Sequence, residues 1–451
     1  MSHFDSVVIG AGQSGPSLAA KLAASGRSTA MIERKLFGGT CVNTGCIPTK
    51  TLIASARTAH VARRAAEYGV NIGGPVRVDM KAVKARKDSI VAQSHDAVEK
   101  SMKTTPNLTA IEGQARFLDA HSIAVNGETH TADNIFLNVG ARAQIPSIPG
   151  LDGIPFRTNS SMMEVDFLPE HLIILGGSYI ALEFGQMYRR FGSDVTIVNR
   201  GARIMAREDP DVTQAVQEIL EGEGIRIYNG CQNIRAAAGV KLIWNTGSVE
   251  GSHLLVATGR IPNTDDLALD RAGIHTDEHG YIMVDDQLRT TVPHIWAMGD
   301  CNGRGAFTHT SYNDYEIVAA NFFDNDPRRV SDRIACYNLY VDPPLGRCGM
   351  TETEVRATGR PALIATRPMT KVARAVEKGE TQGFFKVLVD SESKLILGAS
   401  LLGVECDEVI HLLLDMMYAK KPCSVLQRAM HIHPTVSELI PTLLGDLKPL
   451  V

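Results

Sequence analysis

The stretch FDSVVIGAGQSGPSLAAKLAASGRSTAMIE, residues 4–33, decides the fold of this chain. Its first seven residues are rich in Val and Ile, which favour a strand, and residues 14–26 place apolar side chains at helical spacing. The run STAMIE at 28–33 is a second β-rich segment. The order strand, helix, strand predicts a βαβ unit and therefore an α/β fold with a parallel sheet.

The turn between the first strand and the helix carries the pattern G-x-G-x-x-G at Gly10, Gly12 and Gly15. The first glycine permits the tight turn, the second lets the backbone approach a pyrophosphate, and the third packs the helix on the strand. Glu33 ends the second strand, where a carboxylate can accept hydrogen bonds from ribose hydroxyls. We therefore expect the first unit to bind an adenine dinucleotide.

A second unit repeats this layout in HLIILGGSYIALEFGQMYRRFGSDVTIVNR, residues 171–200. Gly176 holds the first glycine position, and Ser178 replaces the second. The acidic residue that an NAD site places at the end of the second strand is replaced by Asn199, followed by Arg200 and soon by Arg203. Loss of a carboxylate and gain of cations favour a 2′-phosphate, so we expect NADPH here, with NADH as the alternative donor.

The rest of the chain divides at composition changes. The proline-rich segment at 145–155 predicts a connector, and β-rich runs followed by a helical pattern predict a separate α+β domain at the C-terminus. The expected organisation is a first dinucleotide-binding domain in two parts, a second one between them, and the α+β domain. These domains are expected at residues 1–150 and 269–334, 151–268, and 335–451.

Composition excludes several classes of protein. The 451 residues are 44% hydrophobic and 21% charged, with a formal net charge of −4, so no basic field for nucleic acid is expected. No apolar run reaches the length of a membrane span, and we expect no membrane association. The eight cysteines are scattered, which argues against a secreted disulfide scaffold and for the reducing cytoplasm. We expect a small-molecule substrate.

Two cysteines stand close together in GGTCVNTGCIPTK, residues 38–50, at Cys41 and Cys46. A zinc site needs at least two further ligands, and no second close pair exists; a chance pair of buried thiols is the other alternative. A helical pattern begins near Cys46, and the N-terminus of a helix lowers the pKa of a thiol. The flanking glycines also let the backbone approach a ligand, so a redox pair is the favoured interpretation.

This segment resembles the active-site stretch of the class I pyridine nucleotide-disulfide oxidoreductases. That family includes dihydrolipoamide dehydrogenase, glutathione reductase, mercuric reductase and the reactive-chlorine-resistance flavoproteins. Other family motifs are similar to TTVPHIWAMGDC at 290–301, LNVGA at 137–141, LLVATGRIPNT at 254–264 and HIHPTVSE at 431–438. The motifs follow one another along essentially the whole chain, and their combination is specific to the family.

The resemblance implies FAD in the first unit and NADPH in the second. It implies that Cys46 is the thiolate next to the flavin and that Cys41 is the exposed thiol that attacks the substrate. It places Lys50 beside the flavin ring in a pair with Glu183, and it makes Tyr179 the gate of the nicotinamide pocket.

The resemblance further implies a homodimer built through the C-terminal domain. His433 of the partner subunit, oriented by Glu438 of the same subunit, would then accept and return the proton of the attacking thiol. Asp300 matches the family's contact with the ribityl chain. Further cofactor contacts are assigned by the resemblance to Thr40, Ala115, Gly140, Thr308, Ile180 and Gly259, and no resident metal ion is expected.

The implied function is electron transfer from NADPH through FAD to a Cys41–Cys46 disulfide, and on to a disulfide or a metal ion such as Cu²⁺ or Hg²⁺. Glutathione reductases place an arginine in the first helix where this chain has Ala20, and Asn199 argues against an NAD-linked lipoamide enzyme. The closest similarity is to the reactive-chlorine-resistance and mercuric-reductase-like branch. The alternatives are a dihydrolipoamide dehydrogenase of a 2-oxoacid dehydrogenase complex, a redox-silent flavin-binding partner protein, and an NAD(P)H oxidase.

Overall fold

The structure is a computed structural model that describes residues 2–450. It contains the expected βαβ opening: β1 (Ser2–Ile9), α1 (Gly15–Ala24) and β2 (Thr29–Glu33), with β1 and β2 parallel. The end of β1 is buried on both faces, because α1 covers one face and other segments of the first unit cover the opposite face. This burial explains the continuous apolar run that the sequence shows there.

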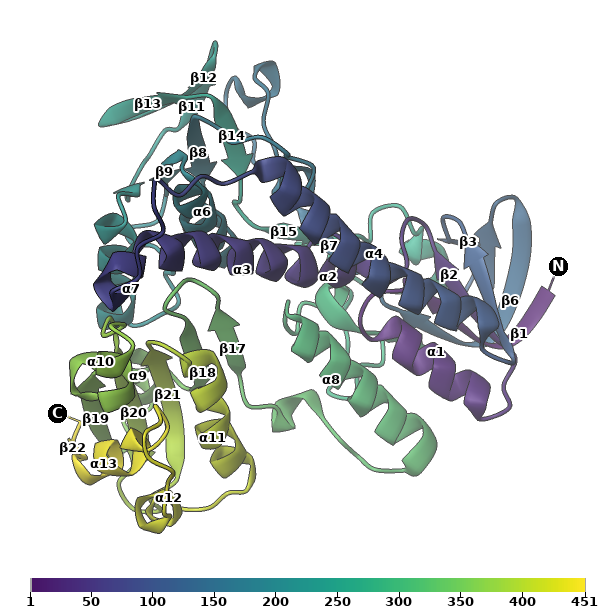
Figure 1. Cartoon of the computed structure of the whole chain (residues 1–451). Coiled ribbons are helices and arrows are strands. Elements are labelled where there is room, and N and C mark those ends of the chain that lie inside the picture. The colour runs from purple at the N-terminus through teal and green to yellow at the C-terminus, as the bar shows by residue number, and fades with distance from the viewer. Residues whose placement is uncertain (1, 451) are drawn as a thin grey trace.

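The first sheet has the strand order β3-β2-β1-β6-β5-β4, and β16 pairs with β6. Because β16 lies far along the chain, the chain returns to this sheet after building a second unit. Figure 1 shows α8, which follows β16, beside α1. The remaining strands are β3 (Leu108–Glu112), β4 (Arg116–Phe117), β5 (Ser122–Val125), β6 (Glu128–Leu137) and β16 (Ile295–Ala297). The helices of this unit are α2 (Gly39–Asn43), α3 (Cys46–Arg63), α4 (Met80–Thr104) and α8 (Thr308–Ala319).

The second unit has a parallel sheet in the order β10-β9-β8-β14 and a three-stranded antiparallel sheet, β11-β12-β13. Its strands are β8 (His171–Leu175), β9 (Asp194–Val198), β10 (Arg226–Tyr228), β11 (Arg235–Ala237), β12 (Val240–Trp244), β13 (Gly247–Gly251) and β14 (His253–Val256). Its helices are α5 (Asn159–Met162), α6 (Tyr179–Phe191) and α7 (Pro210–Gly222). The chain enters and leaves this unit through β7 (Ala141–Ala143) and β15 (Arg260–Pro262), which pair with each other.

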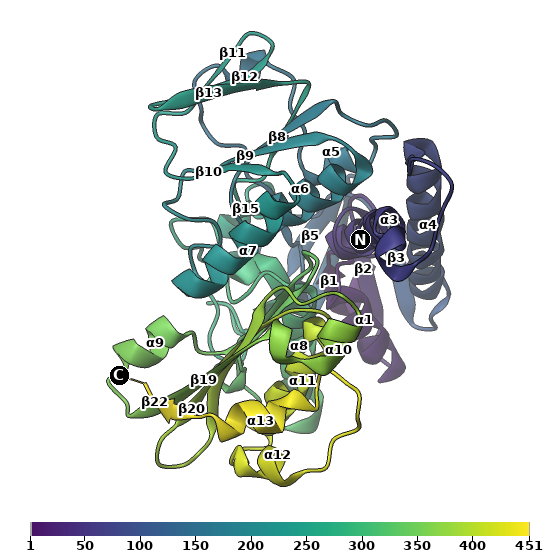
Figure 2. The same cartoon turned by 60° about the vertical axis from the view of Figure 1, so that its left-hand side comes forward.

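The third unit is a six-stranded antiparallel sheet in the order β17-β18-β21-β20-β19-β22. Figure 2 shows α11, α12 and α13 along one side of it. Its strands are β17 (Cys336–Leu339), β18 (Leu345–Gly349), β19 (Ala362–Pro368), β20 (Phe384–Asp390), β21 (Ile396–Leu402) and β22 (Lys448–Pro449). Its helices are α9 (Glu352–Ala357), α10 (Ala373–Glu377), α11 (Cys406–Tyr418), α12 (Ser424–Arg428) and α13 (Leu439–Gly445).

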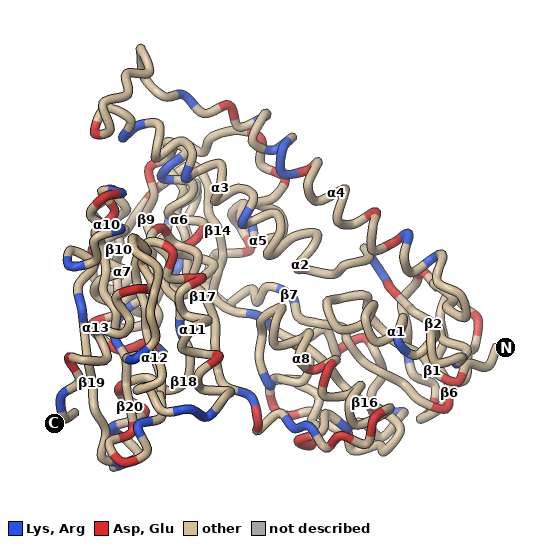
Figure 3. The backbone as a smooth tube through the Cα atoms, turned by 60° about the horizontal axis from the view of Figure 1, so that its bottom comes forward, with Lys and Arg blue, Asp and Glu red and all other residues tan. Residues whose placement is uncertain are grey.

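Figure 3 shows the positions of basic and acidic residues scattered along the backbone of all three units. This mixture agrees with the small net charge of −4. Among residues 2–450, no helix combines the length and the apolar character that a membrane crossing requires.

A buried ion network joins the second unit to the third. Lys386 on β20 is 1% exposed, and its Nζ lies 3.0 Å from Asp209 and 2.7 Å from Asp211. Burial would raise the pKa of Asp209, but backbone N–H groups of Thr353 and Glu352 and the Lys386 ammonium outweigh it and lower the pKa to about 2. This shift corresponds to about 2 kcal/mol of stability that is present above about pH 4 and is lost as the pH falls toward 2.

We expect Lys386→Met to lower the free energy of unfolding by about 3–5 kcal/mol at pH 7, because it leaves the buried carboxylate of Asp209 without its cation. The measurement is urea unfolding followed by intrinsic fluorescence. Lys378→Met is the matched control, since its pair with Glu405 is partly exposed and should contribute less than about 1 kcal/mol. A loss at Lys386 no larger than that of the control would contradict the role of the network.

Candidate active site

The first glycine loop closes tightly against the end of β6. Gly10 has φ +100°, and a Cβ there would lie 2.3 Å from the carbonyl oxygen of Asn138. A Cβ at Gly15 would lie 2.2 Å from the carbonyl oxygen of Gly10. Only glycine fits at both positions, so the loop brings backbone up to the start of α1, where a phosphate group binds well.

Glu33 is oriented beside this loop by two backbone donors. Its Oε2 accepts from the N–H of Ala11, and its Oε1 accepts from the N–H of Lys35, both at 2.8 Å. A carboxylate offers about four acceptor sites, so each oxygen can take a further hydrogen bond. The loop and this carboxylate together fit the pyrophosphate and ribose of an adenine dinucleotide.

One large cavity connects the two glycine loops and the cysteine pair. Its volume is about 2480 Å³, well above the roughly 300–1,000 Å³ of a pocket for one small ligand. The residues expected at the site that line it are Gly12, Thr40, Cys41, Cys46, Lys50, Gly140, Gly176, Ser178, Tyr179, Ile180, Glu183, Asn199, Arg200, Gly259, Asp300 and Thr308. The expected site residues that do not line it are Gly10, Gly15, Glu33, Ala115, His433 and Glu438.

Cys46 is the first residue of α3, as the sequence predicts, and Cys41 lies on the short helix α2. Both are free, half-buried thiols, and Cys46 Sγ lies 3.0 Å from the hydroxyl of Thr308. A hydrogen bond with Cys41, together with Thr308 and the Lys50 ammonium, outweighs burial and lowers the pKa of Cys46 to about 6. The same thiol–thiol bond and burial raise the pKa of Cys41. The reduced pair therefore holds its negative charge on Cys46.

Lys50 follows Cys46 by one helical turn and pairs with Glu183 on α6. Its Nζ lies 3.0 and 2.8 Å from the two carboxylate oxygens, and Glu183 is 4% exposed. The backbone N–H of Tyr340 donates to the same carboxylate at 3.0 Å, and Lys50 Nζ lies 4.6 Å from the centre of the Tyr340 ring. The contact of Tyr340 was not foreseen from the sequence, because it joins residues 157 positions apart.

The pKa of Cys46 leads to a pH prediction. With a pKa of about 6, roughly one tenth of Cys46 is thiolate at pH 5 and roughly nine tenths at pH 7, so its alkylation rate should rise about tenfold over this interval. The measurement is iodoacetamide labelling of the reduced protein, with Cys46 quantified by peptide mass spectrometry. Cys41→Ala removes the hydrogen bond and should move the inflection to higher pH. An inflection near the ordinary thiol value in the unmodified protein would contradict this account.

Tyr179 is the first residue of α6, and its ring lies 5.7 Å from that of Phe307. Phe307 in turn stacks on Tyr337 at 5.4 Å with an interplanar angle of 4°, and on His309. All four rings line the cavity beside Thr308. This row of rings was not foreseen from the sequence; the aromatic residues on either side of Thr308 in AFTHTSY were the available signal.

The end of β9 and the segment after it present three arginines to the cavity, Arg200, Arg203 and Arg207. Arg200 is exposed and lines the cavity, whereas Asn199 is buried and its amide donates to Asn229 at 2.8 Å. Arg203 is held locally, because its guanidinium donates to the carbonyls of Ala206 and Glu208. A negatively charged group near the end of β9 would therefore meet the guanidinium of Arg200, and the amide of Asn199 would not repel it as a carboxylate would.

Two expected cofactor contacts lie in different settings. Asp300 lines the cavity, where burial raises the pKa of its carboxyl and Arg260, 3.3 Å away, opposes the rise. Ala115 is buried in the core of the first unit, and its carbonyl accepts from the side chain of Gln114 at 3.0 Å. Only a backbone contact remains open to Ala115.

His433 and Glu438 form a pair within one chain but away from that chain's own cysteines. His433 Nδ1 lies 3.0 Å from a carboxylate oxygen of Glu438, and the imidazole side chain is 73% exposed. The same segment exposes Met430 at 99% and Ile432 at 81%. Neither residue lines the large cavity of its own chain.

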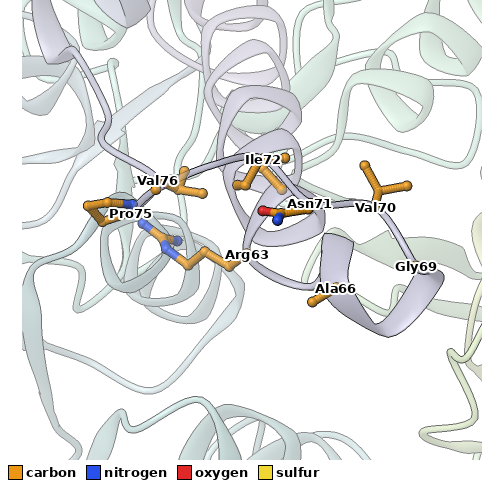
Figure 4. A pocket seen from close by; sticks show the side chains of 10 residues that line it. Arg63, Ala66, Gly69, Val70, Asn71, Ile72, Pro75 and Val76 are labelled. Atoms are coloured by element: carbon orange, nitrogen blue, oxygen red, sulfur yellow. The ribbon is translucent and has the colours of Figure 1, made fainter.

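A second pocket lies beside the loop that follows α3. It measures about 660 Å³ and is lined mainly by small and apolar residues, which Figure 4 shows around Arg63 and Asn71. Arg63 uses its guanidinium to donate to the carbonyl of Arg190. The pocket brings no cysteine, histidine or carboxylate together, so it offers none of the chemistry of the large cavity.

Two dinucleotide-binding units that share a cavity with a polarised dithiol define a class of redox enzyme. The family model of the pyridine nucleotide-disulphide oxidoreductases matches residues 4–314, and the model of their dimerisation domain matches residues 337–444. The chain belongs to this family and is a flavin-dependent oxidoreductase that uses a pyridine nucleotide. The family expectation from sequence is confirmed, as is the fold of two Rossmann-like units with a C-terminal dimerisation domain.

Individual relatives are similar along nearly the whole chain. The probable pyridine nucleotide-disulfide oxidoreductase RclA of Escherichia coli K12 is 35% identical over 99% of this chain and 100% of its own length. The dihydrolipoyl dehydrogenase of Haloferax volcanii is 31% identical over 96% and 94%, and the mercuric reductase of Streptomyces lividans is 31% identical over 97% and 94%. The structure called HOCl-induced flavoprotein disulfide reductase RclA from E. coli matches with a TM-score of 0.90 at 34% identity, covering 98% and 99% of the two chains.

Proposed function

We propose that this enzyme passes electrons from NADPH through FAD to the Cys41–Cys46 disulfide and then to a disulfide or metal-ion substrate. The observation that carries the proposal is the single cavity that joins both glycine loops to a dithiol whose charge rests on Cys46. When bound, the flavin supplies the redox chemistry that links hydride transfer from a nicotinamide to reduction of a disulfide. The protein residues hold the nucleotides and manage the thiols.

The two thiols divide the substrate chemistry. Cys41, deprotonated by His433 of a second copy, attacks one sulfur of a substrate disulfide, and the other sulfur leaves as a thiol with the proton from the imidazole. The Cys46 thiolate then attacks Cys41 Sγ, which closes the Cys41–Cys46 disulfide and releases the second substrate thiol. Lys50 and Glu183 position charge beside Cys46, and Tyr179 covers the pocket for the nicotinamide.

The cofactor contacts belong to the same proposal. The first unit holds FAD through the loop of Gly10, Gly12 and Gly15 and the carboxylates of Glu33 and Asp300. Further backbone or side-chain contacts to FAD come from Thr40, Lys50, Ala115, Gly140 and Thr308. The second unit holds NADPH through contacts of Gly176, Ser178, Ile180, Asn199, Arg200 and Gly259. The glycine cradles and the shared cavity support this assignment.

The active unit in this proposal is a homodimer. The match to the family's dimerisation domain and the outward-facing pair of His433 and Glu438 support it. We place the domain boundaries near residues 150, 268 and 334, supported by the β7–β15 pairing and the start of β17 at Cys336. A cytoplasmic location is part of the proposal and is supported by eight scattered free thiols.

The substrate is proposed from the relatives as well as from the thiols. One similar structure is described as the Cu(II) complex of the E. coli RclA reductase, with a TM-score of 0.91, and mercuric reductases are among the relatives. Thiolates are soft ligands that bind thiophilic ions such as Hg²⁺ and Cu⁺, the reduced form of Cu²⁺, tightly. A dihydrolipoamide dehydrogenase is the second candidate, favoured by relatives with that name at up to 31% identity.

The test is anaerobic titration of the purified flavoprotein with NADPH, followed by separate additions of Cu²⁺, Hg²⁺, lipoamide and glutathione disulfide. We expect the long-wavelength absorbance of a thiolate beside an oxidised flavin, discharged rapidly by one acceptor. Rapid discharge by lipoamide alone would establish the second candidate. Failure of the absorbance to form would refute the coupling of the cysteines to the flavin.

Coenzyme choice gives a separate prediction. Asn199→Glu with Arg200→Phe places a carboxylate where a ribose hydroxyl can bond and removes one of the cations that line the cavity. We expect the ratio of kcat/KM for NADPH over NADH to fall about 10–100-fold, the effect of losing a charged hydrogen bond of about 1.5–3 kcal/mol. Arg235→Phe is the control, since this exposed arginine of the same unit does not line the cavity. An unchanged ratio would refute the role of the β9 end.

A further inference from the structure

A second pair of cysteines faces each other across the first two strands of the third unit. Cys336 on β17 and Cys348 on β18 are direct partners in the antiparallel register. Directly opposite residues point to the same face of a sheet, and both side chains belong to one hydrophobic cluster with residues of α11. The two thiols are therefore neighbours, although eleven residues separate them in the chain.

Antiparallel strands contain hydrogen-bonded and non-hydrogen-bonded residue pairs, and the Cα atoms are closer in the second kind. The hydrogen bonds beside Cys336 and Cys348 show which kind of pair they form. The N–H of Gly349 donates to the carbonyl of Ala335 at 2.7 Å, so the flanking pair is the hydrogen-bonded one. Cys336 and Cys348 thus occupy a non-hydrogen-bonded position, where Cα atoms stand about 4.5 Å apart. Disulfides span Cα separations of about 4.4–6.8 Å, so a bond needs no change of register.

The two thiols differ in access. Cys348 is fully buried, whereas Cys336 is half-buried and lines the large cavity. Burial raises the pKa of both groups, and that of Cys348 reaches about 12, so both are neutral thiols at pH 7. An oxidant therefore reaches Cys336 first, and the pair stays reduced until one arrives.

We infer that Cys336 and Cys348 form a second oxidisable dithiol, which a small two-electron oxidant such as hypochlorous acid converts to a cross-strand disulfide. The oxidant transfers oxygen to Cys336 Sγ and leaves as chloride and a proton, which gives a sulfenic acid. Cys348 Sγ then bonds to Cys336 Sγ, and the hydroxyl leaves as water with the thiol hydrogen. Two thiols are thus oxidised, and one hypochlorous acid is reduced to chloride.

The bond would attach an edge strand to its neighbour beside the active site. β17 is the outermost strand of its sheet and pairs with β18 alone. It carries Tyr337, whose ring lines the cavity, and it leads directly to Tyr340, whose N–H holds Glu183. The disulfide would therefore secure the segment that supports the Lys50–Glu183 pair, independently of which substrate the enzyme reduces.

The test is a peptide map of the holoenzyme after treatment with one to three equivalents of hypochlorous acid, without reduction. Trypsin cleaves after Arg333, Arg347 and Arg356, so the two cysteines fall in separate peptides, 334–347 and 348–356. We expect these peptides to be linked, two hydrogens lighter than their sum, and to separate after reduction. The readout requires no turnover, so it is independent of the proposed function.

Cys348→Ala is the matched variant, and in it the link should vanish while Cys336 takes up additional oxygen. Three results in the unmodified protein would overturn the inference. In the first, Cys336 becomes a sulfinic or sulfonic acid while Cys348 is still a thiol; in the second, Cys336 is linked to another cysteine. In the third, both thiols are unreacted once Cys41 and Cys46 are oxidised. Because these results come from the unmodified protein, the test stands even if the variant folds poorly.

Discussion

Replacement of Cys41 by serine is expected to lower substrate reduction at least about 1,000-fold while NADPH still reduces the bound flavin. The reason is that a serine hydroxyl is a far weaker nucleophile than a thiolate, and mutants that lose a nucleophile show losses of this size or larger. A serine hydroxyl can still donate a hydrogen bond to Cys46, and the contacts of Thr308 and of the Lys50–Glu183 pair are unchanged. The measurement is stopped-flow reduction of the flavin beside steady-state turnover with the acceptor.

The control for this variant is Cys423→Ala, a buried thiol of the third unit outside the cavity, which should keep both activities. Parallel loss of flavin reduction and substrate reduction in Cys41→Ser would contradict the division of roles between the two thiols. Retained substrate reduction would instead show that electrons leave the enzyme without passing through Cys41, as in the oxidase alternative.

Replacement of His433 by glutamine is expected to lower disulfide reduction about 100- to 10,000-fold, the usual contribution of a general acid–base group. The imidazole is 73% exposed and lies outside the cavity of its own chain, so its action has to come from a second copy. Flavin reduction by NADPH should be unaffected. The measurement is steady-state turnover with the acceptor beside stopped-flow reduction of the flavin.

Hybrid dimers distinguish action across subunits from action within one. A hybrid of Cys41→Ser and His433→Gln chains contains one intact site if the imidazole comes from the partner, so it should show about half of the normal activity. If the imidazole acted within its own chain, both sites would be damaged and the hybrid would be inactive. The reverse hybrid, a double mutant paired with an unmodified chain, should give the opposite pattern and serves as the control.

Local pattern accounts for the parts of the fold that the sequence predicted well. The glycine loops, the two βαβ units and the start of α3 at Cys46 each depend on residues within about thirty positions of one another. Helix α4 was missed for a related reason. Of its 25 residues, only Met80, Lys87 and Met102 are buried, so it lacks the apolar stripe that marks a helix.

The family, the two nucleotide-binding units and the close pair of Cys41 and Cys46 could therefore be recognised from the sequence alone, because short-range spacing encodes them. Only the tertiary structure decided that one cavity joins these parts, that Tyr340 holds Glu183, and that Cys336 faces Cys348. It also decided that His433 and Glu438 point away from their own chain's cavity. These features arise from strand register and from the packing of units distant in the chain, which periodicity along the sequence does not specify.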